Sequence, residues 1–390
     1  MDEFRLIAPC HFGLESVLKR EIVSLGFEID SVQDGRVTFR GKNDAVPRAN
    51  IFLRTAERVL VSVGEFDAFT FEELYQGTKA LPWEDILPKN ARFWVKKASS
   101  VKSKLFSPSD IQSIVKKAMV DRLSEKHGIS IFPEDGDEYP LRVFINKDRV
   151  TVGLDSTGVS LHKRGYRKKQ GAAPIAENLA AALIMLTPWK KDRILIDPFC
   201  GSGTFLTEAA MIAANMAPGR NREFTAEAWD HLIDRRLWYR AADEAEALIN
   251  TDIDCDIQGY DIDAGVIRVA RENAVNAGVS ELIHFQERPV RELSHSGRYG
   301  FIITNPPYGE RLEEKEALKR IYSELGEAFK KLDSWSLYVI TSYDDAEKYI
   351  GKKAGKNRKI YNGMIQTRFF IFEGPKPPRR TGDKVRGQQA

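Results

Sequence analysis

The stretch Asp197-Pro198-Phe199-Cys200-Gly201-Ser202-Gly203-Thr204 decides the fold class of this chain. The apolar residues 194–196 before it predict a short buried strand, and residues 205–214 after it have the apolar pattern of a helix. Two glycines one residue apart let the backbone pass close to a ligand at the carboxyl end of the strand, where open α/β sheets bind their ligands. The stretch therefore predicts a strand, a ligand-binding loop and a helix.

Strands and helices alternate along the rest of this half of the chain. We predict a helix over 174–186 and strands over 194–196, 257–260, 283–285, 301–304 and 337–341. The last two apolar segments, 359–361 and 365–372, are joined by Asn362-Gly363, a dipeptide typical of hairpin turns. This order predicts an α/β, Rossmann-like parallel sheet that ends in an antiparallel hairpin.

The first 160 residues have a different pattern, in which short strands alternate with amphipathic helices. An apolar segment 4–9, a helix over 14–25 and a hairpin signal at Asp34-Gly35 predict one small α+β unit. Strands over 59–63 and 92–95, a helix that starts at Ser107-Pro108 and a strand pair within 141–154 predict a second.

Composition excludes several classes of protein. The chain has 390 residues, of which 42% are hydrophobic and 29% charged, and it contains no apolar run long enough to span a bilayer. Its acidic opening, Met-Asp-Glu-Phe-Arg, differs from a secretory signal, so we expect a cytoplasmic protein that does not contact membranes. Three widely spaced cysteines predict neither disulfides nor a metal site.

The loop at 197–204 is unlike a nucleotide-binding loop. A dinucleotide fingerprint needs its third glycine at position 206, which is Leu206, and a P-loop needs a Lys-Ser or Lys-Thr pair that is absent from this loop. Asp197 ends the strand instead, where a carboxylate can accept a hydrogen bond from an ammonium group such as that of methionine. The loop therefore suits a cofactor without phosphates.

A second motif, Gly259-Tyr260-Asp261-Ile262-Asp263, closes the next strand. A carboxylate at a strand end can accept hydrogen bonds from both hydroxyls of a ribose, and Asp261 is the candidate. Asp263 is better placed to cap the helix that follows.

A third motif, Asn305-Pro306-Pro307-Tyr308, follows the strand 301–304. Prolines stiffen the turn, so the Asn305 side-chain oxygen and the Pro306 carbonyl can accept hydrogen bonds from an amino group while Tyr308 lies over a base. Two acceptors concentrate the lone pair of an exocyclic amine for attack on a methyl group, without a metal ion. A rigid structural turn is the alternative for this motif alone.

Cations gather at two places. The segment 162–169 predicts an RNA-binding strip or, equally, a solvated linker; its candidate contacts are Lys163, Arg164, Tyr166, Arg167, Lys168 and Lys169. The strand and loop 92–104 combine Phe93 and Trp94 with lysines 96, 97, 102 and 104. This pattern is typical of an RNA surface, but such aromatic residues are more often core.

With its three motifs in order, the chain resembles the class I methyltransferases that act on exocyclic amines, specifically the THUMP-domain RNA methylases of the large-subunit rRNA guanine-N2 type. The resemblance implies a ferredoxin-like segment over 1–60, a THUMP RNA-binding domain over 45–160 and a methyltransferase domain over 161–374. Residues 375–390 are rich in proline, arginine and lysine and have no apolar period, which predicts a flexible basic tail. The resemblance also implies S-adenosylmethionine as cofactor and Asn305, Pro306 and Tyr308 as catalytic residues. The implied cofactor-binding residues are Asp197, Phe199, Gly201, Gly203, Thr204, Asp261, Ile262 and Asn305.

The resemblance implies methylation of guanine N2 in 23S rRNA. The alternatives are guanine N2 in tRNA, adenine N6, and an RNA-binding assembly factor without activity; the oligomeric state stays open. Pro289 stands where such enzymes often place an acid that meets the adenine of the cofactor. Glu287 or backbone groups of the same loop are the alternatives there. The long interval between Asp197 and Asp261 predicts extra helices that pack their aromatic residues, or a lip around the base pocket.

Overall fold

The computed structural model describes residues 3–168, 175–308, 314–363 and 365–378. These residues form two compact units. Unit 1 comprises residues 1–164 together with 216–249, and unit 2 comprises 165–215 together with 250–390. Lys169 and most of the predicted basic tail lie outside the described residues.

Unit 1 is built on one seven-stranded sheet rather than two separate ones. Its strand order is β2-β3-β1-β4-β7-β6-β5. Strand β4 joins the two predicted α+β parts, because it pairs with β1 through Leu6 and Val61 on one side and with β7 along its whole length on the other. The strands are β1 (Glu3–Pro9), β2 (Glu28–Gln33), β3 (Arg36–Lys42), β4 (Leu60–Asp67), β5 (Arg92–Val101), β6 (Glu138–Asn146) and β7 (Arg149–Asp155).

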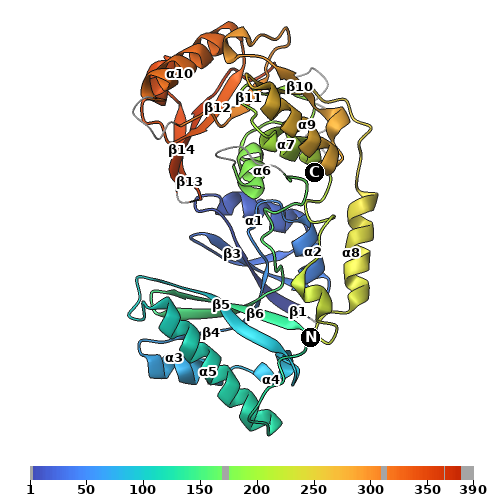
Figure 1. The fold of residues 1–390 in the computed structure, drawn as a ribbon, viewed down its shortest axis with the longest axis vertical. Coiled ribbons are helices and arrows are strands. Elements are labelled where there is room, and N and C mark those ends of the chain that lie inside the picture. Colours follow the sequence, from blue (N-terminus) through green and yellow to red (C-terminus); the bar gives the residue numbers. More distant parts are fainter. Residues whose placement is uncertain (1–2, 169–174, 309–313, 364, 379–390) are drawn as a thin grey trace, which may run out of the picture. The chain divides into compact units, whose positions relative to one another are not determined.

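Five helices from the first 164 residues pack on this sheet. They are α1 (Glu15–Ser24), α2 (Ala45–Phe52), α3 (Phe71–Lys79), α4 (Trp83–Ile86) and α5 (Pro108–His127). The Ser107 side chain accepts a hydrogen bond from the Asp110 backbone N–H, which caps α5 where the sequence predicts its start. Helices α3 and α5 lie side by side on the THUMP part of the sheet (Figure 1).

Residues 216–249, inserted in the sequence of the methyltransferase half, fold with unit 1. They contain η1 (Thr225–Ala228) and α8 (Arg235–Ala247). The Trp229 ring stacks on Tyr139 with centroids 5.2 Å apart, and its indole N–H donates to the Glu138 carbonyl. The prediction of extra helices that pack their aromatic residues is confirmed for the buried Trp229 and Trp238, whereas Tyr239 is exposed.

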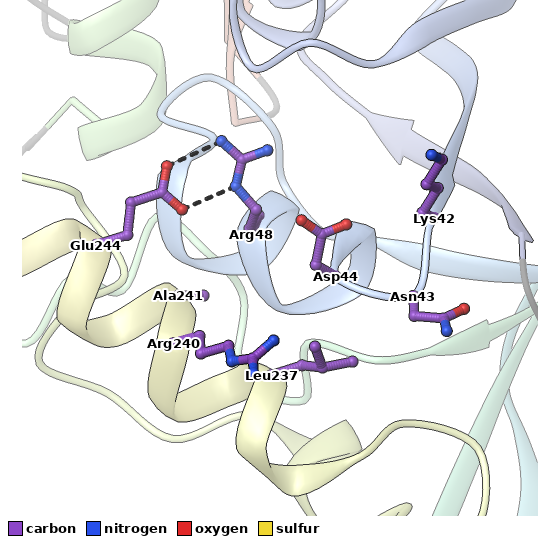
Figure 2. A pocket seen from close by; sticks show the side chains of 8 residues that line it. All are labelled: Lys42, Asn43, Asp44, Arg48, Leu237, Arg240, Ala241 and Glu244. Carbon is purple, nitrogen blue, oxygen red and sulfur yellow. Dashed lines mark hydrogen bonds and ion pairs between the residues drawn. The ribbon is translucent and has the colours of Figure 1, made fainter.

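A bidentate ion pair ties α8 to α2. Two guanidinium nitrogens of Arg48 each donate to one carboxylate oxygen of Glu244 at 2.9 Å, and Figure 2 shows both bonds crossing between the two helices. Paired bonds of this kind fix orientation as well as distance. The inserted helix is therefore held in register on the ferredoxin-like part of unit 1.

Unit 2 contains the predicted α/β sheet. Its order is β10-β9-β8-β11-β12-β14-β13, with parallel pairing up to β12 and an antiparallel hairpin at the end. The strands are β8 (Leu195–Asp197), β9 (Ile257–Asp261), β10 (His284–Glu287), β11 (Phe301–Thr304), β12 (Ser336–Thr341), β13 (Lys356–Asn362) and β14 (Ile365–Phe372). The predicted fold class is confirmed.

Helices cover the sheet of unit 2. They are α6 (Glu177–Leu186), α7 (Thr204–Ala213), α9 (Ala264–Ala277), η2 (Ser280–Leu282), η3 (Val290–Glu292), α10 (Glu314–Lys331) and α11 (Ala346–Ile350). Buried residues of α10 such as Tyr322 and Leu325 belong to one hydrophobic core with Ile302 of β11 and Leu337 of β12. Helix α6, the first helix of unit 2, begins at Glu177, later than the predicted start at residue 174.

Among the described helices, none is both long and apolar enough to cross a bilayer.

Candidate active site

The glycine loop after β8 is held by close packing at one glycine and is open at the other. Gly201 and Gly203 have φ values of +53° and +79°, in the region that favours glycine. A Cβ at Gly203 would lie 3.1 Å from side-chain atoms of Ala270 and Phe285. Among the described residues, none apart from its two chain neighbours has an atom within 4 Å of the Cβ position at Gly201. Gly203 therefore seats the loop on α9 and β10, and Gly201 leaves room for a ligand.

Asp197 is buried at the end of β8. Its Oδ1 accepts hydrogen bonds from the Thr304 hydroxyl at 2.6 Å and from the Phe199 backbone N–H at 3.1 Å. Burial raises the pKa of Asp197 to about 7, against the opposing effect of these two donors. Both bonds reach the same oxygen, so Oδ2 is the atom that can serve an incoming cation.

Asp261 ends β9 beside the glycine loop. Its two carboxylate oxygens each accept one backbone N–H at 3.1 Å, from Gly201 and from Asp263. Burial raises the pKa of Asp261. Each carboxylate oxygen has two lone-pair sites, so both oxygens can accept a further bond from a ligand hydroxyl.

The Asp263 side chain caps α9, as the sequence predicts. Its Oδ1 accepts from the Gly265 backbone N–H at 2.7 Å and from that of Val266 at 3.3 Å. The two aspartates of this motif therefore have separate roles: Asp261 can accept hydrogen bonds from a ligand, and Asp263 caps α9.

The turn Asn305–Tyr308 follows β11, the neighbour of β8 in the sheet. The Tyr308 hydroxyl donates to Asn305 Oδ1. Burial raises the pKa of Tyr308 to about 12, so this hydroxyl keeps its proton at neutral pH. A hydrogen bond from α10 stabilises the turn: the Tyr322 hydroxyl donates to the Pro307 carbonyl at 3.3 Å.

A cavity of about 470 Å³ at the strand ends of unit 2 brings the three motifs together. We call it the strand-end cavity. The predicted residues that line it are Phe199, Gly201, Asp261, Ile262, Asn305, Pro306 and Tyr308. Asp197, Gly203 and Thr204 are buried or packed behind this wall. The cavity lies where the strand order reverses around β8, the position at which open α/β sheets bind ligands.

Residues outside the three predicted motifs also line the cavity, and of these the sequence pointed only to the loop of Pro289. Pro289, Val290 and Arg291 line the cavity, whereas Glu287 does not. Helix α10 contributes Arg320, Ile321 and Glu324. The loop after β10 thus reaches the cavity through an apolar proline and valine, without an acid at the place where the family pattern has one.

The side chains of the cavity fit a nucleoside with an amino-acid part. The Asp261 carboxylate has capacity for two ribose hydroxyls, and the Ile262 side chain, 69% exposed, offers an apolar surface beside it for a flat base. Pro289 and Val290 extend that apolar surface. Gly201 leaves space for a thioether chain. These residues fit S-adenosylmethionine.

The cationic linker has most of its predicted contacts turned into the protein. Arg164 donates to the Leu161 carbonyl at 2.6 Å and is 3% exposed. The Tyr166 hydroxyl donates to Glu208 at 3.1 Å. Arg167 forms an ion pair with Glu177 at 3.0 Å and a bond to the Thr204 hydroxyl at 3.3 Å. Contact with RNA therefore stays a proposal for the exposed Lys163 and Lys168. The contacts of Arg164, Tyr166 and Arg167 are made within the protein.

The strand and loop 92–104 divide in a similar way. Phe93 is buried in the core of unit 1, with the Lys116 ammonium 3.7 Å from its ring centroid. Its core interpretation is confirmed. Lys102 and Lys104 in the loop are exposed. Phe93 is thus structural, Trp94 is half-buried, and the cations of the loop face solvent.

Three family models match successive parts of the chain. Residues 5–60 match the RlmL ferredoxin-like domain, residues 68–155 match the THUMP domain, and residues 164–370 match the RMKL-like methyltransferase domain. Strand β4 falls mostly between the first two matches, in agreement with its position at the centre of the shared sheet.

Curated relatives match over nearly the whole chain. A candidate RNA methyltransferase of Bacillus subtilis (strain 168), YpsC, is 45% identical over 97% of this chain and 98% of its own length. The ribosomal RNA large subunit methyltransferase K/L of Cellvibrio japonicus (strain Ueda107) is 34% identical over 94% of this chain. The chain spans about half the length of that relative, 50%.

Solved structures have the same architecture. A candidate methylase from Clostridium difficile 630 is 51% identical, with a TM-score of 0.93 over 97% of this chain and 100% of its own. A predicted N6-adenine-specific DNA methylase from Listeria monocytogenes str. 4b F2365 is 47% identical, with a TM-score of 0.89 over 96% and 97%. A candidate methyltransferase complexed with SAH is 41% identical, with a TM-score of 0.89 over 97% and 100%.

These matches join the motif geometry to a family. The strand-end cavity lies within residues 164–370, the part matched by the methyltransferase model. The chain therefore belongs to the RMKL-like methyltransferase family, with S-adenosylmethionine as its cofactor and with RlmL-type ferredoxin-like and THUMP domains ahead of its catalytic domain.

Proposed function

We propose that the chain methylates the exocyclic N2 of a guanine in 23S rRNA in the cytoplasm. The observation that carries this proposal is the position of the Asn305–Tyr308 turn in the wall of the strand-end cavity, together with Asp261 and the glycine loop. The same cavity thus offers a place for the methyl donor and a pair of oxygen acceptors for an amine.

The residues of the chain divide into donor-holding and amine-holding groups. Asp197 and Asp261 would hold the ammonium and the ribose of S-adenosylmethionine, and Ile262 and Val290 its adenine. When bound, the cofactor supplies an electrophilic methyl group on a sulfonium. No metal is required of the protein in this reaction, because the methyl group leaves behind a neutral thioether.

Asn305 and Pro306 orient the base amine. Asn305 Oδ1 and the Pro306 carbonyl each accept a hydrogen bond from one N–H of the amine. These two bonds concentrate the nitrogen lone pair in the direction of the methyl group. Tyr308 covers the base ring. Asn305 Oδ1 accepts one hydrogen bond from the Tyr308 hydroxyl in this structure, and an entering amine either takes the place of that hydroxyl or uses the second lone pair of Oδ1.

RNA as the substrate is supported by the THUMP match and by the printed names of the relatives. Guanine N2 in rRNA is the base and site favoured by the resemblance. Adenine N6 is the rival that one comparison favours, since a solved relative is described as an N6-adenine-specific DNA methylase. An Asn-Pro-Pro-Tyr turn can accept hydrogen bonds from either amine.

The test is methyl transfer from labelled S-adenosylmethionine to total RNA from a strain that lacks the corresponding gene, followed by nucleoside analysis. We expect labelled N2-methylguanosine in 23S rRNA. Label in tRNA would move the proposal to the tRNA enzyme, and N6-methyladenosine would replace the base. Pre-ribosomal particles and DNA are assayed in parallel, and cofactor binding with no transfer to any of them would favour an assembly factor without activity.

A further inference from the structure

Unit 1 has a hollow of about 390 Å³ that lies outside the catalytic domain. We call it the Phe12 hollow, after its most exposed aromatic residue; the residues that matter here are Phe12, Arg36, Val101, Lys102, Phe144 and Lys147. They come from the β1–α1 loop, the start of β3 and the adjacent ends of β5 and β6. The hollow therefore joins the ferredoxin-like and THUMP parts of one sheet.

We infer that the Phe12 hollow binds an unpaired nucleotide of the RNA substrate, with its base against Phe12 and its phosphates against Lys102 and Lys147. The inference rests on the proposed function for the class of substrate. It adds which part of the RNA is bound outside the catalytic cavity and which residues bind it.

The first argument is the exposure of apolar surface among cations. Phe12 is 54% exposed and Val101 is 56% exposed, although residues of both types are usually buried. Arg36 lies against the Phe144 ring, with its guanidinium carbon 5.4 Å from the ring centroid. Exposed aromatic faces interleaved with cations are typical of sites for single-stranded nucleic acid, where bases stack and phosphates are neutralised.

The second argument is the backbone at the rim. Lys102 and Lys147 each have φ of +51°, in the left-handed region. Lys147 and Asp148, whose φ is +64°, form the two-residue turn between β6 and β7, where positive φ at both positions is the usual hairpin geometry. The Lys147 N–H donates to the Val101 carbonyl at 3.1 Å, and the Lys104 N–H donates to Asp148 at 2.7 Å, so the two loops hold each other in place beside the hollow.

Neither lysine at the rim is neutralised by the protein. Within the described part of the chain, no carboxylate lies within ion-pair distance of Lys102 or Lys147. Asp34 is the single acid among the residues that line the hollow, against the three cations Arg36, Lys102 and Lys147. The excess positive charge is complementary to a phosphate backbone.

The loop that carries Phe12 is fixed in advance. Glu15 Oε1 accepts backbone N–H groups from Gly13 at 3.0 Å and from Gly35 at 2.7 Å, so one carboxylate holds the Phe12 loop against the β2–β3 turn. A preorganised ring loses little freedom when a base stacks on it. Bases within a duplex are already stacked, so only an unpaired base can use this face.

The test measures binding of a fluorescein-labelled, unstructured 12-nucleotide RNA, and of its duplex, to the whole chain by fluorescence anisotropy. Phe12→Ala should weaken single-strand binding about 5- to 160-fold and change duplex binding less than twofold, because a stacked base contributes about 1–3 kcal/mol. Phe12→Tyr, which keeps the ring, should bind within twofold of the wild-type chain. Lys102→Ala/Lys147→Ala should flatten the salt dependence by about 0.7 in log–log slope for each phosphate that the protein no longer neutralises. Lys89→Ala, an exposed lysine elsewhere in unit 1, is the control.

An equal loss of single-strand and duplex binding in Phe12→Ala would overturn the inference. Unchanged RNA affinity in all variants would do so too, and would leave the hollow to a protein partner. Cofactor binding and methyl transfer are measured on the same samples. If Phe12→Ala weakens single-strand binding but the wild-type chain transfers no methyl group, the proposed function alone is contradicted. If the wild-type chain transfers methyl groups but Phe12→Ala leaves RNA binding unchanged, this inference alone is contradicted.

Discussion

The two sides of the strand-end cavity are held by different kinds of contact. On the cofactor side, the Asp261 carboxylate is fixed by backbone N–H groups of Gly201 and Asp263. On the base side, Asn305 is held by a side-chain bond from Tyr308. Backbone donors stay in place when a ligand enters, whereas a side-chain hydroxyl can rotate away. The cofactor side is therefore preformed, and we propose that the base side exchanges one hydrogen bond when the substrate binds.

The largest expected effect separates the two sides. Asn305→Ala removes a side-chain acceptor that acts on the amine, and groups of this kind contribute about 10²- to 10³-fold to the rate. We expect kcat/KM for methyl transfer to fall by that factor, while the dissociation constant for SAH, measured by calorimetry, stays within about twofold. Asn357→Ala, an exposed asparagine on β13, is the control. A parallel loss of SAH affinity would show that the two sides are not independent.

The next effect tests the cofactor side with a matched pair of aspartates. Asp261→Asn removes a charge-assisted acceptor, and we expect SAH affinity to fall about 10- to 100-fold, since a hydrogen bond to a charged group contributes about 1.5–3 kcal/mol. Asp263→Ala removes a helix cap instead, which costs about 1 kcal/mol of folding stability in a thermal or urea melt. Its SAH affinity should stay near that of the wild-type chain. Equal affinity losses in the two variants would contradict the separate roles.

The third effect concerns Asp197 and pH. Burial raises the pKa of this carboxyl to about 7, so below pH 7 it is mostly protonated in the cofactor-free protein. An acceptor for an ammonium group must be ionised, so affinity for SAH should rise with pH as the carboxyl ionises, by roughly tenfold between pH 6 and 7.5.

Asp197→Asn supplies the baseline for that experiment. Its affinity should be lower and nearly independent of pH over the same interval, in which the amine of the ligand stays mostly protonated. The same pH dependence in both proteins would assign the effect to another group and remove Asp197 from the cofactor site.

The cofactor side could be predicted from sequence because its determinants are local. Asp197, Gly201 and Asp261 lie at the ends of strands whose apolar pattern is clear, and the carboxyl ends of neighbouring parallel strands meet at one edge of a sheet. The remaining wall could not be predicted in this way. Arg320 and Glu324 reach the cavity from α10, whose amphipathic pattern predicts a helix but not which site it borders.

The linker shows a second limit of sequence patterns. A dense run of cations predicts exposure, but Arg164 and Arg167 are buried because acceptors distant in sequence, such as the Arg54 carbonyl and Thr204, meet their guanidinium groups. The Phe12 hollow shows the reverse case. Its cations come from three segments that are far apart in the sequence and become one surface only through the order of strands in the sheet.

The smallest expected effect tests the exchange of bonds on the base side. Tyr308→Phe keeps the ring that covers the base and removes the hydroxyl that occupies Asn305 Oδ1. If an entering amine displaces this hydroxyl, its removal should lower KM for RNA by about two- to tenfold, the value of one net hydrogen bond, with kcat nearly unchanged. Tyr308→Ala also loses the ring and should raise KM. A higher KM in Tyr308→Phe would mean that the hydroxyl contacts the substrate, so that the base side, like the cofactor side, is preformed.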